Sequence, residues 1–236
     1  MDFRGRLLAT LQAIAPVLDV PDVVVIGSQV PNLLQPDLAS TLVVSKDVDI
    51  GVPVTRHGAV KEALRHVRAL HPSTEEPSVW VPVDPLLLEV NFVGMDESID
   101  DTEETYVLED AELPLMVFGA LSLVRPGGTV AIEGTRIRLP RVAGLLLEKL
   151  LTERSGIKGD RDLLVALALI VLAADADLDE GVGAYRLLAP HLRHAVRANL
   201  SALSLMEPVE GMPDPRPQRA RVAALLRRLD GSEPRP

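Results

Sequence analysis

Two aspartates, Asp47 and Asp49, interrupt an apolar segment that otherwise has the sequence of a buried strand. Residues two apart on a strand point to the same face, so the two carboxylates lie side by side, about 6 to 7 Å apart at their Cβ atoms. At an effective dielectric of about 20, two unit charges at that distance repel by roughly 2.5 kcal/mol. Because Mg²⁺, or Mn²⁺, takes carboxylate oxygens and leaves positions open for water and phosphates, this spacing predicts a divalent metal site.

A third acid and a glycine-containing turn could complete such a site. Glu89 lies inside a later apolar segment and would supply a third oxygen ligand if its strand pairs with the first. Gly27 and Ser28 follow an apolar strand and precede a short predicted helix from Gln29 to Leu34. Their backbone N–H groups are therefore placed to hold the outer phosphates of a nucleotide.

Each of these features also has a purely structural interpretation. Asp47 and Asp49 could belong to an exposed edge strand with one solvated face, and Glu89 could be a surface acid or a partner in a buried ion pair. Strand-ending Gly-Ser turns are common in proteins. The apolar neighbours Val48 and Ile50 favour the functional interpretation, because they make the strand only half solvated.

Taken together, these residues resemble the DNA polymerase beta-like nucleotidyltransferase superfamily, and most closely its small bacterial AbiEii-like branch. The resemblance lies in Gly27-Ser28 after a strand, in the segment 45–50 (SKDVDI) and in the segment 88–92 (LEVNF). It touches residues 23–93 and 140–173, about half of the chain. The helical part of the resemblance consists of Glu148-Lys149-Leu150, Arg154, Lys158, Asp160 and Asp162.

The resemblance implies metal-assisted nucleotidyl transfer. Asp47 and Asp49 would hold two magnesium ions, while Glu89, or a group that it orients, lowers the pKa of the acceptor hydroxyl that attacks the α-phosphate and expels pyrophosphate. Lys149 or Lys158 would neutralise the leaving group. The residues expected to contact the nucleotide are Gly27, Ser28, Lys46, Lys149 and Lys158. Structural alternatives for the last two are a lysine at the edge of an apolar stripe and a loop that leads into a helix N-cap.

The sequence departs from the family pattern at two places. The interval from Ser28 to Asp47 is long for the superfamily. Many members carry an aspartate where Asn91 stands, and Asn91 shares a face with Glu89. If Asn91 occupies the third acidic position, catalysis is weakened or lost while nucleotide binding survives.

The surrounding pattern predicts an α/β (α+β) fold: a nucleotidyltransferase-type mixed sheet flanked by helices, followed by an all-α helical bundle. The expected parts are a core of residues 1–139, a helical subdomain of 140–206, and a Pro-rich linker with a basic terminal helix at 207–236. The opening helix could pack on either half. The expected elements of the core are strands at 23–26, 42–54, 80–83 and 86–93, a helix at 60–70, a solvated loop or flap at 96–112, and a hairpin at 115–139 that turns at Pro126-Gly127-Gly128.

Composition limits the class of protein. With 236 residues, 47% of them hydrophobic, the chain supports one large domain or two small ones. It has no cysteine, which excludes thiolate zinc sites, iron–sulfur clusters and cysteine nucleophiles and favours a cytoplasmic location. No apolar run reaches the roughly 18 residues of a membrane span, so we expect no membrane association. A net charge of −10 lacks the basic footprint of a nucleic-acid-binding protein.

The sequence therefore predicts a cytoplasmic, magnesium-dependent nucleotidyltransferase that uses a nucleoside triphosphate. The acceptor could be a tRNA, a protein or a small molecule, and the acidic charge mildly favours the last two. The resemblance also allows a cognate antitoxin as partner. Two alternatives remain: a catalytically inactive nucleotide- or partner-binding member of the same fold, and a plain structural protein.

Overall fold

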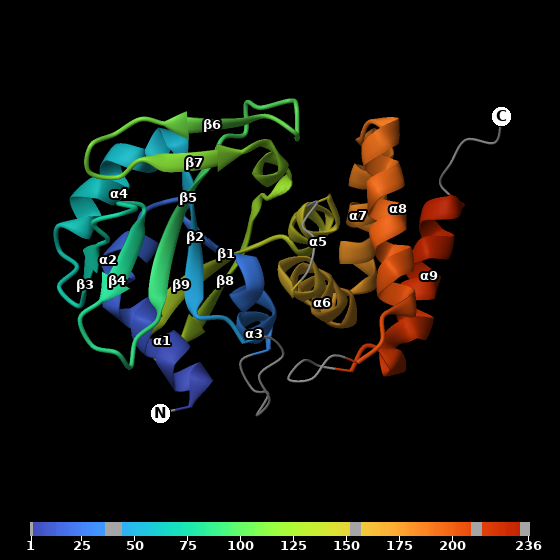
Figure 1. Ribbon diagram of the computed structural model, residues 1–236, viewed down its shortest axis with the longest axis horizontal. Coiled ribbons are helices and arrows are strands. Elements are labelled where there is room, and N and C mark those ends of the chain that lie inside the picture. The colour runs from blue at the N-terminus through green and yellow to red at the C-terminus, as the bar shows by residue number, and fades with distance from the viewer. Residues whose placement is uncertain (1, 36–43, 152–156, 209–213, 232–236) are drawn as a thin grey trace. The chain divides into compact units, whose positions relative to one another are not determined.

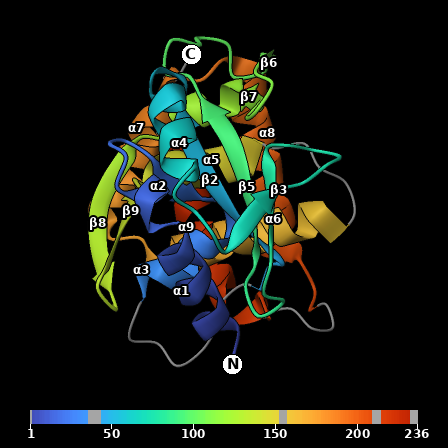
Figure 2. The same ribbon diagram turned by 90° about the vertical axis from the view of Figure 1, so that its left-hand side faces the viewer.

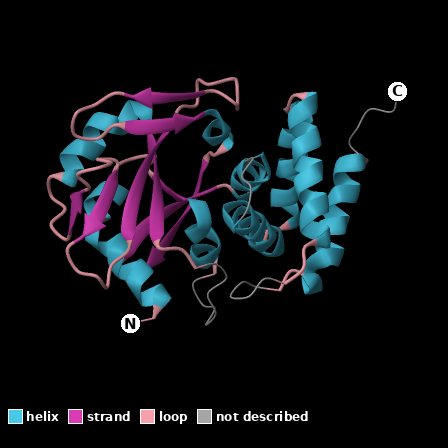
Figure 3. Ribbon diagram, in the orientation of Figure 1, coloured by secondary structure: helices cyan, strands magenta, loops and turns pink. Residues whose placement is uncertain are grey.

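Strands occupy the first part of the chain and helices the last in the computed structural model (Figure 3). It describes residues 2–35, 44–151, 157–208 and 214–231. The chain divides into two units between Pro140 and Arg141. The predicted fold class, a mixed sheet flanked by helices and followed by helices alone, is confirmed.

The first unit is built on a seven-stranded mixed sheet (Figure 1). Its main path runs β1-β2-β5-β4-β3, and β7 pairs with both β5 and β6. The strands are β1 (Val24–Ile26), β2 (Asp47–Pro53), β3 (Leu70–Pro72), β4 (Val79–Pro82), β5 (Glu89–Met95), β6 (Thr105–Leu108) and β7 (Leu115–Phe118). Strands β2 and β5 are parallel, whereas β1 and β4 run antiparallel to them, so β2 and β5 lie in the interior of the sheet.

One face of this sheet carries the core. Val48, Ile50 and Val90 point to this face and are fully buried in one apolar cluster with Leu7 and Leu11 of the first helix. The opening helix therefore packs on the sheet of the first unit. The helices of this unit are α1 (Phe3–Ala13), α2 (Ala15–Leu18), α3 (Val30–Leu34) and α4 (His57–Leu64), with short 3₁₀ turns η1 (Gly27–Gln29), η2 (Val54–Arg56) and η3 (Gly119–Leu123). Strand alternation leaves the other face to the odd-numbered residues of β2 and β5.

A separate two-stranded hairpin, β8 (Pro126–Ile132) and β9 (Thr135–Pro140), completes the first unit. Figure 2 shows it as a long curved ribbon near α2 and α3. The hairpin turns at Glu133-Gly134, where both residues have positive φ (49° and 82°). The predicted turn at Pro126-Gly127-Gly128 is therefore wrong: those residues begin β8.

Three other predicted elements differ from the structure. The expected helix 60–70 ends earlier, and Leu70 begins β3. Segment 96–112 contains β6 as well as loops, because alternate exposed positions of an edge strand accept polar residues. The predicted strand 42–54 begins at Asp47, and its residues 42 and 43 lie outside the described residues.

The second unit is helical throughout its described residues. Buried leucines and alanines of α5 and α6 supply its apolar interior. The terminal helix α9 packs on α8, and Arg228 forms an ion pair with Asp175 of α7, so this helix is part of the second unit. The helices are α5 (Val142–Leu151), α6 (Ile157–Leu172), α7 (Asp175–Leu187), α8 (Pro190–Leu205), the 3₁₀ turn η4 (Arg216–Gln218) and α9 (Arg219–Asp230). None of the helices in the described ranges combines the length and the apolar character needed to cross a membrane.

Candidate functional site

Asp47 and Asp49 lie on the interior strand β2, on the face opposite the apolar cluster. β1 pairs with one edge of β2 and β5 pairs with the other, so the alternative of an exposed edge strand is excluded. Both aspartates are half-buried, while Val48 between them is fully buried on the other face. The alternation of the strand thus places two carboxylates next to each other on one side of an otherwise apolar strand.

Asn91 joins the two carboxylates. The parallel register places Asp49 beside Asn91 and Asp47 beside Glu89, so all four side chains share one face. The Asn91 Nδ2 group donates to Asp47 Oδ2 at 3.0 Å and to Asp49 Oδ1 at 3.3 Å. The partial positive charge of the amide N–H groups therefore lies between the carboxylates, where a cation would relieve their repulsion.

Two further polar residues fix Asp47. The Ser45 hydroxyl donates to Asp47 Oδ1, and the fully buried Gln29 donates its side-chain amide to the Asp47 carbonyl at 3.0 Å. Asn32 in turn donates to Gln29 Oε1 at 3.2 Å. Sequence analysis did not assign a role to Ser45, Gln29 or Asn32. A signal for two of them was present in the sequence, since Ser45 lies two residues before β2 and Gln29 three residues after β1.

Gly27 brings the turn after β1 against the second carboxylate. Ile26 pairs with Asp49, and the chain then bends at Gly27 with φ of 75°. A Cβ atom at this position would lie 2.1 Å from Asp49 Oδ2. Only glycine fits, both because of the positive φ and because of this close approach. The neighbouring Ser28 is 9% exposed. The close approach of Gly27 to Asp49 places the predicted Gly27-Ser28 turn beside the second aspartate.

Glu89 lies at the start of β5, next to Asp47 in the register, and is exposed. Within the described residues, no three histidine, aspartate or glutamate side chains gather closely enough to hold a metal ion. The structure thus brings Asn91, rather than Glu89, into contact with both aspartates. The role of Glu89 as a third ligand stays a prediction.

The three predicted lysines lie in different parts of the chain. Lys46 is exposed and directly precedes β2. Lys149 belongs to the second unit, is 7% exposed, and pairs through Nζ with Glu148 Oε2 at 3.1 Å and with Asp162 Oδ1 at 3.4 Å. These ion pairs lie within the second unit, and a role of Lys149 in nucleotide binding stays a prediction. Lys158 is in α6, but its side chain lies outside the described residues.

The residues at the aspartate pair fit a magnesium site with two carboxylates. Asp47 and Asp49 offer oxygen ligands, and the Asn91 amide has an oxygen that a rotation of its χ2 would present in place of the nitrogen. Mg²⁺ commonly takes one or two protein carboxylates and completes its shell with water and substrate phosphates. A magnesium site formed by these residues, water and substrate phosphates therefore does not need a third acidic side chain.

Comparisons with known proteins give only weak structural similarities. No protein-family model matches the chain, and no curated protein matches it. An antigenic nucleotidyltransferase-like protein from Paracoccidioides brasiliensis is 16% identical with a TM-score of 0.43, covering 82% of this chain and 93% of that one. The antibiotic-resistance factor ANT(2'')-Ia is 12% identical with a TM-score of 0.38 over 79% and 98% of the two chains.

A third similar structure, a putative nucleotidyltransferase from H. pylori, is 16% identical with a TM-score of 0.37, covering 99% of this chain and 98% of that one. At identities this low, the similarities say nothing about the reaction. Membership of the AbiEii-like branch is not shown by any of them.

Proposed function

We propose that this protein is a magnesium-dependent nucleotidyltransferase, which moves a nucleoside monophosphate from a nucleoside triphosphate to an acceptor hydroxyl. The observation that carries the proposal is the pair Asp47 and Asp49, joined by the Asn91 amide and closed on one side by Gly27. Two carboxylates side by side and half-buried repel each other, and a divalent cation would offset that repulsion more fully than the neutral Asn91 amide does.

The chain's own groups have separate tasks under this proposal. Asp47 and Asp49 would hold the metal, which when bound withdraws charge from the α-phosphate and from the departing pyrophosphate. The backbone N–H groups of Gly27 and Ser28 would bind the β- and γ-phosphates. Ser45 and Asn91 hold the carboxylates in position.

The transfer itself is an in-line substitution at phosphorus. The acceptor oxygen forms a new bond to the α-phosphorus, the bond from that phosphorus to the bridging oxygen breaks, and pyrophosphate leaves. Glu89, exposed beside Asp47, is the group we assign to accept the proton of the acceptor hydroxyl. The acceptor would be a tRNA, a protein or a small molecule. A cognate antitoxin would be a further partner of this protein.

A second candidate function is favoured by Asn91 itself. An amide stands between the two aspartates, and it already supplies N–H groups that relieve their repulsion. A member of the fold with this arrangement could bind a nucleotide or a protein partner without turnover. The two candidates differ in whether a divalent metal is needed for nucleotide binding.

Isothermal titration of nucleoside triphosphates, with Mg²⁺ or with a chelator, separates these candidates. We expect metal-dependent binding by the parent and none by the double variant Asp47→Asn/Asp49→Asn. The matched control is Asp100→Asn, an exposed aspartate of the same unit, which keeps parental binding. Pyrophosphate release on addition of cell extract supports the enzyme. Tight binding that ignores the metal supports the second candidate, and absence of nucleotide binding in both conditions overturns the enzyme and the nucleotide-binding form of the second candidate.

A further inference from the structure

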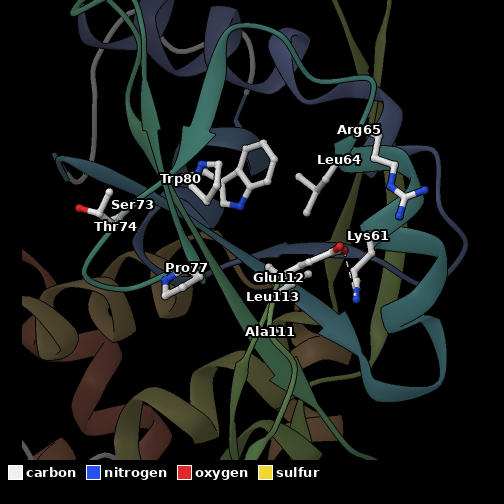
Figure 4. Close-up of a pocket in the computed structure, with 11 residues that line it drawn as sticks. Lys61, Leu64, Arg65, Ser73, Thr74, Pro77, Trp80, Ala111, Glu112 and Leu113 are labelled. Carbon is white, nitrogen blue, oxygen red and sulfur yellow. Dashed lines mark ion pairs between the residues drawn. The ribbon is translucent and has the colours of Figure 1, made fainter.

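A pocket of about 470 Å³ lies in the first unit (Figure 4). The pairing of β4 with β5 places it on the face of the sheet opposite the aspartates. Trp80 of β4 pairs with Val90 of β5, so its side chain points to the same face as Val90. Asn91, the next residue of β5, points to the other face with the aspartates. The pocket is therefore separate from the candidate active site, and its volume falls in the range of small-molecule sites.

The floor of the pocket is apolar. Leu64 of α4, Trp80 of β4 and Leu113 from the segment before β7 line it. The Trp80 ring is held by an edge-to-face contact with Phe92, with ring centroids 6.2 Å apart and an interplanar angle of 84°. A planar ring of a ligand would bury its surface against these side chains.

Trp80 also carries a hydrogen-bond donor that has no acceptor. The residue is only 9% exposed, and its buried Nε1–H group has no partner among the described residues. Figure 4 shows this nitrogen on the side of the ring that faces the middle of the pocket. A buried donor without a partner loses the hydrogen bond that water would give it, so a ligand with an acceptor oxygen would recover that loss.

The charged residues of the lining favour a negatively charged ligand. Two of the lining residues are cations, Lys61 on α4 and Arg65 at the C-cap of the same helix, and Glu112 is the acid among the lining residues. Lys61 Nζ is 2.8 Å from Asp110 Oδ2 and 3.2 Å from Glu112 Oε2, and the Glu112 side chain is 62% exposed. Arg65 pairs with Glu62, and both side chains are 64% exposed. The Glu62 and Glu112 contacts are surface ion pairs, which a ligand can replace at little cost.

From these observations we infer that the pocket binds a small aromatic carboxylate. The ring packs on Trp80 and Leu64, one carboxylate oxygen accepts the indole N–H, and the negative charge pairs with Arg65 and Lys61. This site is independent of the proposed nucleotidyl transfer, since the two lie on opposite faces of the sheet.

The single tryptophan of the chain makes a direct test possible. The full chain labelled with ¹⁵N gives one indole N–H resonance, which is followed while 2-naphthoate is added. We expect a saturable downfield shift with this carboxylate and none with the cation 2-naphthylmethylammonium. Arg65→Gln weakens binding about threefold to fivefold, whereas Glu112→Gln tightens it by a similar factor because Lys61 loses a competing carboxylate.

Arg68→Gln is the matched control, since Arg68 is an exposed arginine close to Arg65 in the chain that does not line the pocket. It leaves the affinity for 2-naphthoate unchanged. The inference is overturned by an indole resonance that does not move at millimolar 2-naphthoate, by an equal response to the ammonium compound, or by equal effects of Arg65→Gln and Arg68→Gln. All three substitutions are at exposed side chains, so none of them threatens folding.

Discussion

Asn91 donates its side-chain amide to Asp47 across the parallel strands β5 and β2, with Nδ2 3.0 Å from Oδ2. The same nitrogen reaches Asp49 at 3.3 Å, so one neutral residue separates two charged ones. The chain thereby places a neutral hydrogen-bond donor at a position from which a third carboxylate would repel the first two.

Replacing this residue by an acid should make the first unit depend on metal. In Asn91→Asp, the aspartates lose a donor and gain a third negative charge, so we expect the free energy of unfolding without metal to fall by about 2 kcal/mol. Mg²⁺ should restore most of this loss. Thermal unfolding with a chelator, with millimolar Mg²⁺, and with KCl at matched ionic strength measures the effect. An equal gain from Mg²⁺ in parent and variant would contradict it.

Gly27 and Gly134 form a matched pair that separates backbone strain from steric conflict. Both have positive φ, 75° and 82°, but a Cβ at Gly134 meets nothing within 4 Å, whereas a Cβ at Gly27 meets Asp49 Oδ2 at 2.1 Å. We expect Gly134→Ala to cost about 1 kcal/mol and Gly27→Ala about 3 kcal/mol in urea unfolding. Gly27→Ala should also lose metal-dependent nucleotide binding, while Gly134→Ala keeps it. Equal unfolding free energies for the two variants would show that the approach to Asp49 is unimportant.

Acid stability should depend on Asp110. The Lys61 ammonium, followed by the backbone N–H groups of Leu113 and Glu112, holds the pKa of the Asp110 carboxyl well below its usual range. A carboxyl whose pKa is lower in the folded state stabilises the protein above its ordinary pKa, about 4, and this contribution is lost as the pH falls toward the folded value.

We therefore expect Asp110→Asn to be less stable than the parent at pH 7 and to lose less stability between pH 4 and pH 2. Urea unfolding over that range measures the slope. Asn keeps an oxygen that accepts from the same backbone N–H groups, so the substitution removes the charge and not the turn. Asp100→Asn should retain the parental slope, and an identical slope for Asp110→Asn would refute this prediction.

In the second unit, a substitution of Lys149 tests whether this lysine, which was predicted to contact the phosphates of the nucleotide, instead stabilises the fold. Lys149→Met would remove a cation that pairs with Glu148 and with Asp162, which are both less than 10% exposed. We expect a loss of about 3 to 5 kcal/mol in unfolding free energy, because two nearby buried carboxylates then repel. Lys46→Met, at an exposed lysine, is the control and should cost almost nothing. A stable Lys149→Met protein with weakened nucleotide binding would instead support the predicted role of Lys149 in binding the nucleotide.

The acidic strand and the turn beside it could be predicted from the sequence, because each interrupts a run of apolar residues that would otherwise continue as a buried strand. Asp47 and Asp49 stand in an apolar strand, and Gly27 follows one directly. The partner of the acids depends on pairing between strands, which periodicity does not determine. A shift of one residue between β2 and β5 would change which of their side chains lie beside the aspartates.

The missed hairpin has a different physical reason. Pro126-Gly127-Gly128 has the composition of a turn, but its residues are extended within β8. The real turn uses Glu133 at φ of 49°, a conformation that glutamate seldom adopts, followed by Gly134. Residue types at turns express a preference, and here Gly127 and Gly128 lie at a register shift of the β8–β9 ladder, between Pro126 and Thr129, rather than at its turn.

The position of Trp80 gives the two units different optical signals. All indole emission from this chain comes from β4 of the first unit, whereas the described residues of the second unit are helical and contribute strongly to far-ultraviolet circular dichroism. Denaturation curves recorded by fluorescence would therefore follow the first unit alone, whereas ellipticity at 222 nm would report mainly the second unit with a smaller contribution from α1 to α4. Curves that coincide would mean that the two units unfold together as one cooperative body.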